Sequence, residues 1–276
     1  MGRGVTVRVD SGGIGIEYDV HGTGRPVLLL HGFPDSARLW RNQIPVLVEA
    51  GFQVIVPDQR GYGRSDHPTE VEAYSLPFLA GDVLAVLDDV GVERAHVVGH
   101  DWGAAVAWGI ASLVPDRVDH LAVLSVGNPM AFAAAGFPQR EKSWYMLLFQ
   151  FHEIAERWLS EDDWANFRAW MAHPDADGVI ADLEATGSLT TGLHWYRANV
   201  GPDTYVGSPL ALPPVVAPTM GVWSTGDHHL TEAQMTLSEQ FVTASWRYER
   251  VEGPGHHLQL EAPDAVNALL LDFLPT

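Results

Sequence analysis

The chain has 276 residues and a formal net charge of −19, with 16 Lys and Arg against 35 Asp and Glu and no cysteine. Nucleic acids and anionic membrane surfaces recruit basic patches, so this charge argues against both as partners. The lack of cysteine excludes disulfides, thiol nucleophiles and cysteine-ligated zinc. The N-terminus lacks the basic-then-apolar profile of a signal peptide, and no apolar run is long enough to span a membrane. We therefore expect a cytoplasmic protein.

The predicted elements alternate between strands and helices. Segments 5–9 and 14–20 flank a Gly-rich turn and predict an antiparallel hairpin at one edge of a sheet. Short apolar runs predict further strands at 27–30, 54–56, 96–98, 121–124, 220–223 and 246–248. Helical patterns at 76–90, 104–114 and 231–241 separate most of them, and Thr231 and Gln234 predict a capping box for the last. This order indicates the α/β class, with a doubly wound, mostly parallel sheet.

The alternation of strands and helices breaks between Asn128 and Pro213. Residues 130–210 are aromatic, with several tryptophans, and follow a helical pattern. Prolines bound this segment on both sides, as they often do where one domain is inserted into another. We therefore predict a core made of residues 1–128 and 213–276, and an inserted helical cap, or lid, made of residues 129–212.

The most informative motif is Gly-His-Asp-Trp-Gly at residues 99–103, which places Asp101 where the pattern G-x-S-x-G has a nucleophilic serine. An apolar run precedes it and a helix of small residues follows it, as a sharp turn from strand to helix requires. A carboxylate gains little by attacking an acyl carbon. Its attack on a saturated carbon of an epoxide or alkyl halide gives an ester that water can hydrolyse. Asp101 is therefore the predicted nucleophile of a ring-opening or dehalogenating hydrolase.

Three further motifs accompany the Asp101 turn. They are HGFPDS at 31–36, DQRGYGRSD at 58–66 and GHH at 255–257. Together, in this order, they resemble the α/β-hydrolase family over essentially the whole chain, and within it the epoxide hydrolases. This resemblance implies the α/β-hydrolase fold and an activity on epoxides.

The resemblance also implies the partners of Asp101. His256 stands where the family has its catalytic histidine, and its ordinary pKa of about 6.5 predicts a neutral imidazole that activates water. Asp227, after the strand at 220–223, is the predicted carboxylate that orients this histidine. Some dehalogenases carry the acid after the preceding strand instead. Asn128 stands there and cannot carry the charge.

Other residues are assigned by the same resemblance. Backbone N–H groups of Phe33 and Trp102 would stabilise the oxyanion that forms when water attacks the ester. Tyr145 and Tyr196, in the predicted cap, would donate hydrogen bonds to the epoxide oxygen. The substrate pocket is predicted to include Phe33, Trp102, Trp195 and His257.

These assignments predict an epoxide hydrolase that forms vicinal diols through a covalent ester on Asp101. The expected partners are a small, neutral, apolar epoxide and water. Neither a cofactor nor a metal is expected, because Gly61-Tyr62-Gly63 lacks the third glycine of a dinucleotide site and His228-His229 lacks spaced partner ligands. A homodimer is one open alternative for the assembly.

Two other functions stay open. A haloalkane or fluoroacetate-type dehalogenase would use the same nucleophile, but Phe33 stands where the former commonly has a halide-holding Asn. Trp102 stands where fluoroacetate dehalogenases usually have Arg, although residues 194–196 (His-Trp-Tyr) could bind an anion. A non-catalytic module that binds small molecules is the third possibility, and retention of the complete catalytic set argues against it.

Overall fold

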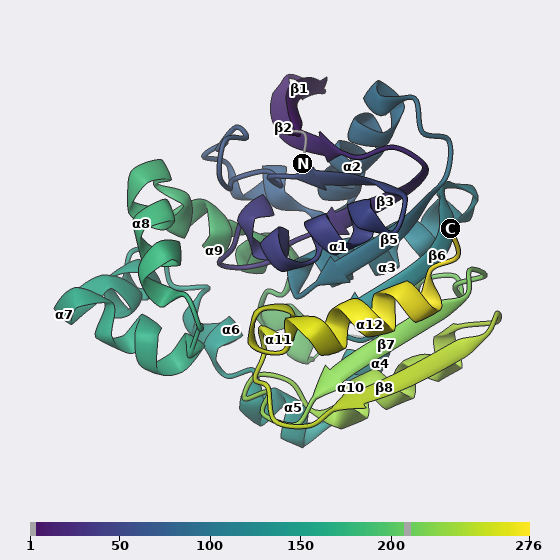
Figure 1. Ribbon diagram of the computed structural model, residues 1–276. Helices are drawn as coiled ribbons and strands as arrows, with labels where there is room; N and C mark the ends of the chain where they lie inside the picture. The colour runs from purple at the N-terminus through teal and green to yellow at the C-terminus, as the bar shows by residue number, and fades with distance from the viewer. Residues whose placement is uncertain (1–3, 207–210) are drawn as a thin grey trace.

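The structure is a computed structural model that describes residues 4–206 and 211–276. Residues 1–3 and 207–210, which the predicted core and cap ranges include, lie outside the described residues. One eight-stranded sheet forms the centre, with strand order β1-β2-β4-β3-β5-β6-β7-β8 (Figure 1). Its strands are β1 (Val5–Ser11), β2 (Ile14–His21), β3 (Arg25–Leu30), β4 (Phe52–Pro57), β5 (Ala95–His100), β6 (Val118–Leu124), β7 (Thr219–Ser224) and β8 (Trp246–Val251).

Strand pairing confirms the predicted topology. β1 and β2 form the antiparallel hairpin, with Val5 opposite Val20. β2 is also antiparallel to β4, whereas all other neighbouring strands are parallel. The predicted doubly wound, mostly parallel sheet is therefore correct. In such a sheet the carboxyl ends of the parallel strands meet at one edge, where ligands bind.

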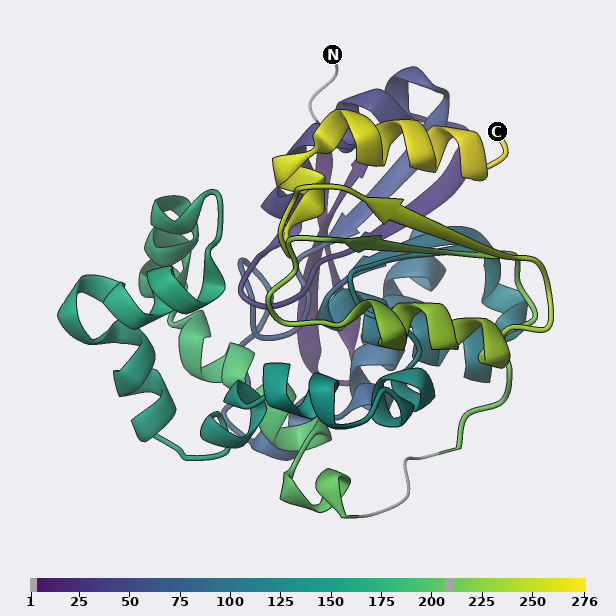
Figure 2. The ribbon, with the colours of Figure 1, turned by 90° about the horizontal axis from the view of Figure 1, so that it is seen from below.

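Helices cover both faces of the sheet because the buried strands are apolar on both sides. In β3, Leu28 and Leu30 belong to the buried cluster on one face of the sheet, whereas Val27 and Leu29 belong to the cluster on the other face. Figure 2 shows the two helical layers on opposite sides of the sheet. The helices of this part are α1 (Ile44–Glu49), α2 (Leu76–Val90), α3 (Trp102–Leu113), α10 (Glu232–Thr236), α11 (Leu258–Glu261) and α12 (Pro263–Phe273), with 3-10 helices η1 (Ala37–Asn42), η2 (Val71–Tyr74), η3 (Pro115–Arg117) and η5 (Leu237–Phe241).

A helical insertion, residues 129–206, lies between β6 and β7. It contains α4 (Pro129–Ala134), α5 (Phe137–Lys142), α6 (Tyr145–Leu148), α7 (Ile154–Met171), α8 (Ala176–Thr186), α9 (Ser188–Asn199) and η4 (Pro202–Tyr205). Its α7 and α8 project beyond the sheet, at the left of Figure 1. Its first helix, α4, packs instead against α10 and η5. Among the described residues, no helix is long and apolar enough to cross a membrane.

The region predicted as one capped helix at 231–241 differs from the prediction. It divides into α10 and the 3-10 helix η5, and no side chain caps α10. Thr231 Oγ1 donates instead to Gln139 Oε1 (2.9 Å), and Gln234 Nε2 donates to the Ser125 carbonyl (2.9 Å). The predicted capping box is wrong because the Thr231 N–H and hydroxyl both donate to Gln139, while the Gln234 amide donates to carbonyls, including that of Thr231 at 3.1 Å.

Candidate active site

Asp101 lies at the sharp turn between β5 and α3. Its backbone has φ 52° and ψ −122°, a conformation that costs a non-glycine residue free energy. Glycines make the turn sterically feasible, because a Cβ at Gly99 would collide with the Gly103 carbonyl and a Cβ at Gly103 would collide with the Leu30 carbonyl. The turn therefore presents the Asp101 carboxylate at the carboxyl edge of the sheet.

Backbone donors surround the Asp101 carboxylate. The Phe33 N–H donates to Asp101 Oδ1 at 2.8 Å. The loop after β3 comes this close because residue 32 is glycine, and a Cβ there would collide with Asp101 Oδ1 and the Trp102 nitrogen. The Trp102 N–H also helps to lower the pKa of the Asp101 carboxyl. The two backbone groups predicted as oxyanion donors thus both lie beside the Asp101 carboxylate.

His256 and Asp227 complete a buried triad with Asp101. His256 Nδ1 donates to Asp227 Oδ2 at 2.9 Å, and His256 Nε2 lies 3.5 Å from Asp101 Oδ2. The other Asp227 oxygen, Oδ1, accepts the backbone N–H groups of His229 (2.8 Å) and Leu230 (3.0 Å). The loops after β5, β7 and β8 therefore hold the nucleophile, the acid and the histidine, respectively, within reach of one another.

The charge state of His256 differs from the sequence-based expectation of a neutral ring. Burial lowers the pKa of His256, but the charge of Asp227 and the hydrogen bond to Asp101 outweigh it and raise the pKa to about 10. Burial raises the pKa of the Asp101 carboxyl, and bonding to His256 more than reverses this. The resting triad is therefore an imidazolium between two carboxylates near neutral pH.

Three residues that the sequence interpretation did not select hold this triad in place. His100 Nε2 and Ser125 Oγ each donate to the His256 carbonyl at 2.9 Å. Lys142 Nζ, from the insertion, donates to the Asp227 carbonyl at 2.6 Å. The available signals were weak: His100 precedes the nucleophile, and Lys142 is the single lysine of the chain.

Tyr145 and Tyr196 lie together beside the triad. Tyr145 comes from α6 and Tyr196 from α9, and their ring centroids are 6.0 Å apart. The Tyr196 ring is 5.1 Å from that of Trp102 and 5.7 Å from that of Phe33. Burial, followed by the charge of Asp101, raises the pKa of both hydroxyls well above 10. Both tyrosines therefore remain neutral hydrogen-bond donors at physiological pH.

An aromatic cage surrounds these tyrosines and includes two residues that the sequence interpretation missed. Phe149 lies with its ring centroid 5.0 Å from Tyr196, and Trp170 lies 4.8 Å from Tyr145. The cage comprises Phe33, Trp102, Tyr145, Phe149, Trp170 and Tyr196. Such a surface suits an apolar ligand with one polar atom.

Comparison with known proteins agrees with this geometry. Residues 25–263 match the family model described as alpha/beta hydrolase fold. Epoxide hydrolase A of Mycobacterium tuberculosis is 35% identical, over 99% of this chain and 98% of that protein. The chain belongs to the epoxide hydrolase branch of the α/β-hydrolase family.

Solved structures of epoxide hydrolases share this architecture over nearly the whole chain. Epoxide hydrolase A from Mycobacterium thermoresistibile is 31% identical with a TM-score of 0.80, over 98% of both chains. A structure described among novel epoxide hydrolases in metagenomes from hot environments is 29% identical with a TM-score of 0.88, over 100% of this chain and 99% of that one.

The other two predicted pocket residues of this epoxide hydrolase lie at the edge of the cage. Trp195 is fully buried behind Trp102, at a centroid distance of 6.0 Å, and its indole N–H donates to the Arg60 carbonyl. His257 adjoins His256, but its ring faces His173, with a centroid distance of 4.1 Å. Their roles as pocket residues remain predictions.

The residues considered for the dehalogenase alternatives have other partners. Asn128 Oδ1 accepts the Met130 N–H at 2.9 Å and caps α4. His194 Nδ1 lies 3.2 Å from Arg197, and the His194 ring packs on Tyr74. Arg197 itself forms an ion pair with Glu156 at 2.8 Å. The guanidinium of Arg197 is therefore paired within the insertion and is not directed at Asp101.

Acidification from pH 6.5 to pH 4 is expected to destabilise the fold. The pKa of His96 and of His100 is lowered to about 4, first because burial disfavours the charged ring. The unfolded chain binds these protons near pH 6.5 and the folded chain only near pH 4, so stability falls as the pH falls through this window. For the fully buried His100 this difference corresponds to about 3 kcal/mol. Thermal unfolding across this pH range measures it.

A matched variant tests the cause of this acid sensitivity. His96 is at the start of β5, away from the triad, and its Nε2 donates to the Pro275 carbonyl at 3.0 Å. Gln can make the same hydrogen bond without titrating, so His96→Gln is expected to show a shallower fall in Tm. If the fall in Tm between pH 6.5 and pH 4 were unchanged in this variant, His96 would not contribute to the acid sensitivity.

Proposed function

We propose that this chain converts epoxides to vicinal diols through an alkyl ester on Asp101. The observation that carries this proposal is the pair of neutral tyrosines, Tyr145 and Tyr196, whose rings lie 6.0 Å apart within the cage around Asp101. An epoxide needs both a nucleophile and a donor for its oxygen, because its leaving group stays attached as an alkoxide. A halide leaving group needs no proton.

In the first step, a carboxylate oxygen of Asp101 attacks one epoxide carbon, and the bond between that carbon and the ring oxygen breaks. The resulting alkoxide takes a proton from Tyr145 or Tyr196, which leaves a tyrosinate. Donation by a preorganised hydroxyl stabilises the charge as it develops.

Ester formation then changes the charge state of His256. One of the two carboxylates that raise the pKa of His256 is Asp101, and the ester removes its charge. The imidazolium becomes more acidic, and its proton passes to the tyrosinate, which restores the neutral tyrosine. His256 is thereby converted to the neutral base that the second step requires. The raised pKa of the resting histidine is thus compatible with its later action as a base.

In the second step, neutral His256 takes a proton from water, and the oxygen attacks the carbonyl carbon of the ester. Backbone N–H groups of Phe33 and Trp102 stabilise the tetrahedral oxyanion. Collapse breaks the bond to the alkyl oxygen, which takes the proton from His256 and leaves as the diol. The Asp101 carboxylic acid then protonates His256 and restores the resting ion pair.

We further propose that residues 129–212 act as a cap that supplies the tyrosines and selects the substrate. The six aromatic rings of the cage favour a small, neutral, apolar epoxide. The nearby Arg197 is already paired with Glu156, which supports a neutral substrate over an anionic one. A homodimer and a cytoplasmic location are kept as predictions.

Turnover of styrene oxide and 1-bromobutane tests the reaction class. We expect diol by chromatography and no bromide at an ion electrode. Bromide without diol would instead identify a dehalogenase, and saturable binding without either product would identify a binding module. A single turnover in water labelled with oxygen-18 should place the label in the peptide that contains Asp101.

The two tyrosines are expected to share one task. Tyr145→Phe or Tyr196→Phe alone should slow ring opening by about 10- to 100-fold, because the other hydroxyl still donates; the double variant should lose about 1,000-fold or more. Pre-steady-state kinetics of ester formation measure this step directly. Tyr248→Phe is a control, since Tyr248 lies on β8, outside the aromatic cage, and its hydroxyl donates to Glu232 of α10. Wild-type rates in the double variant would contradict the proposed mechanism.

A further inference from the structure

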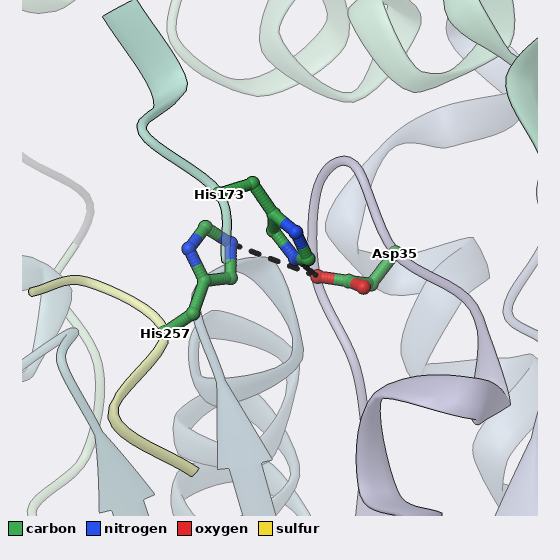
Figure 3. A group of neighbouring side chains, drawn as sticks. All are labelled: Asp35, His173 and His257. Carbon is green, nitrogen blue, oxygen red and sulfur yellow. Dashed lines mark hydrogen bonds and ion pairs between the residues drawn. The ribbon is translucent and has the colours of Figure 1, made fainter. Parts of the chain in front are cut away.

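A second cluster of ionisable side chains lies beside the triad, at the boundary between core and insertion. Asp35 follows β3, His257 precedes α11, and His173 lies between α7 and α8. All three are buried, with exposed fractions of 6%, 0% and 6%. Figure 3 shows the two imidazoles converging on one oxygen of Asp35. We call these three residues the Asp35 cluster.

The spacing of the Asp35 cluster matches that of ligands around a metal ion. Asp35 Oδ2 is 3.3 Å from His173 Nε2 and 3.6 Å from His257 Nε2, and all three donor atoms lie within 4.8 Å of one another. A tetrahedral zinc ion with bonds of about 2.1 Å holds its ligand atoms about 3.4 Å apart. A cation could therefore contact all three atoms after small side-chain adjustments.

His257 supplies an independent indication of a ligand. Both of its ring nitrogens are buried and have no hydrogen-bond partner among the described residues. An unpaired buried polar group costs free energy, and a bound ion would remove this cost.

His173 sets the conditions for binding. The Asp175 N–H donates to His173 Nδ1 at 2.9 Å, so in the resting protein the ring proton is on Nε2 and points to Asp35. A cation must displace this proton, and the Asp175 amide must turn away from Nδ1. The proton moves to Nδ1 in the bound form, and the lost Asp175 hydrogen bond makes binding weaker than at a closed structural zinc site. A crevice lined by Pro34, Asp35 and Asp182 reaches the cluster at Asp35.

We propose that Asp35, His173 and His257 bind one zinc-like divalent cation, which links the insertion to the core. Two imidazoles and one carboxylate suit Zn²⁺, whereas Mg²⁺ and Ca²⁺ prefer oxygen ligands. The site adjoins the catalytic machinery, because the His257 ring centroid is 5.1 Å from that of His256. An ion there adds positive charge beside His256 and restrains the insertion, so it inhibits turnover reversibly.

Thermal unfolding with added Zn²⁺ tests the site without relying on activity. We expect Zn²⁺ to raise the Tm of the wild-type protein by a few degrees, EDTA to reverse the rise, and Mg²⁺ to have no effect. His173→Ala should lose the rise, whereas His152→Ala, which removes an exposed histidine of the same insertion, should retain it. Each variant is compared with its own Tm in EDTA, and His173→Gln replaces His173→Ala if the latter does not fold.

Co²⁺ gives a second readout, because coordination by imidazole and carboxylate at a tetrahedral site produces visible absorption. We expect this absorption in the wild type and in His152→Ala, with its loss in the His173 variants. A Tm rise or zinc inhibition that persists in the His173 variants would indicate that the ion binds instead at the triad of Asp101, His256 and Asp227. That result, or no Tm rise in the wild type, would overturn the proposal.

Discussion

Replacement of Asp101 by Asn is expected to lower diol formation by at least about 10⁴-fold and to abolish the covalent ester. The neutral amide keeps the shape of the carboxylate but loses the charge that attacks carbon. It also removes one of the two carboxylates that raise the pKa of His256. Diol measured by chromatography gives the rate, and intact-protein mass after mixing with styrene oxide shows whether any adduct forms.

Asp116→Asn provides the matched control for this variant, because Asp116 is exposed and remote from the triad. It should turn over at the wild-type rate and pass through the same adduct. Mass spectrometry of the purified Asp101→Asn protein must also show that the introduced amide is intact, since deamidation would restore the nucleophile. Rapid diol formation by Asp101→Asn protein that retains this amide would exclude Asp101 as the nucleophile.

Replacement of His256 by Gln is expected to trap the ester. Gln can still hydrogen-bond to Asp227 but cannot take a proton from water, so alkylation should proceed while hydrolysis slows by about 10³- to 10⁴-fold. One substrate equivalent should remain on the protein in the intact mass. Peptide mapping should then place it on Asp101.

His228→Gln is the control for this second variant, because His228 is exposed and adjoins Asp227 in the sequence. It should show no accumulated adduct at steady state. If His256→Gln instead turned over at the wild-type rate, His256 could not be the base for hydrolysis. If it formed no adduct at all, His256 would be required for the first step as well.

The sheet could be predicted from the sequence because its strands are buried on both faces and separated by recognisable helices. Alternation along 5–9 and 14–20 predicted the hairpin, and β1 and β2 form it. The local sequence could not show that the capping box predicted at Thr231 does not form. The Thr231 hydroxyl instead donates a hydrogen bond to Gln139, which lies in the insertion. Local propensity is overridden where a tertiary partner offers a competing hydrogen bond.

Some residues of the candidate site could likewise be predicted from the sequence, and others could not. Asp101 could be singled out because the glycines around it are required by a turn that few other sequences can form. Phe149 and Trp170 could not, because one aromatic residue among many in a helical segment carries no mark of which face it presents. Their place in the cage depends on how α6 and α7 pack against α9 and the loop after β3.

The sequence by itself determined the fold class, the carboxylate at the sharp turn and therefore the attack on a saturated carbon. These are local properties, carried by residue type and short spacing. Only the tertiary structure decided that His256 rests as an imidazolium and that Asp35, His173 and His257 converge. Charge state and coordination depend on burial and on distances of a few ångströms between residues far apart in the chain, which no local pattern encodes.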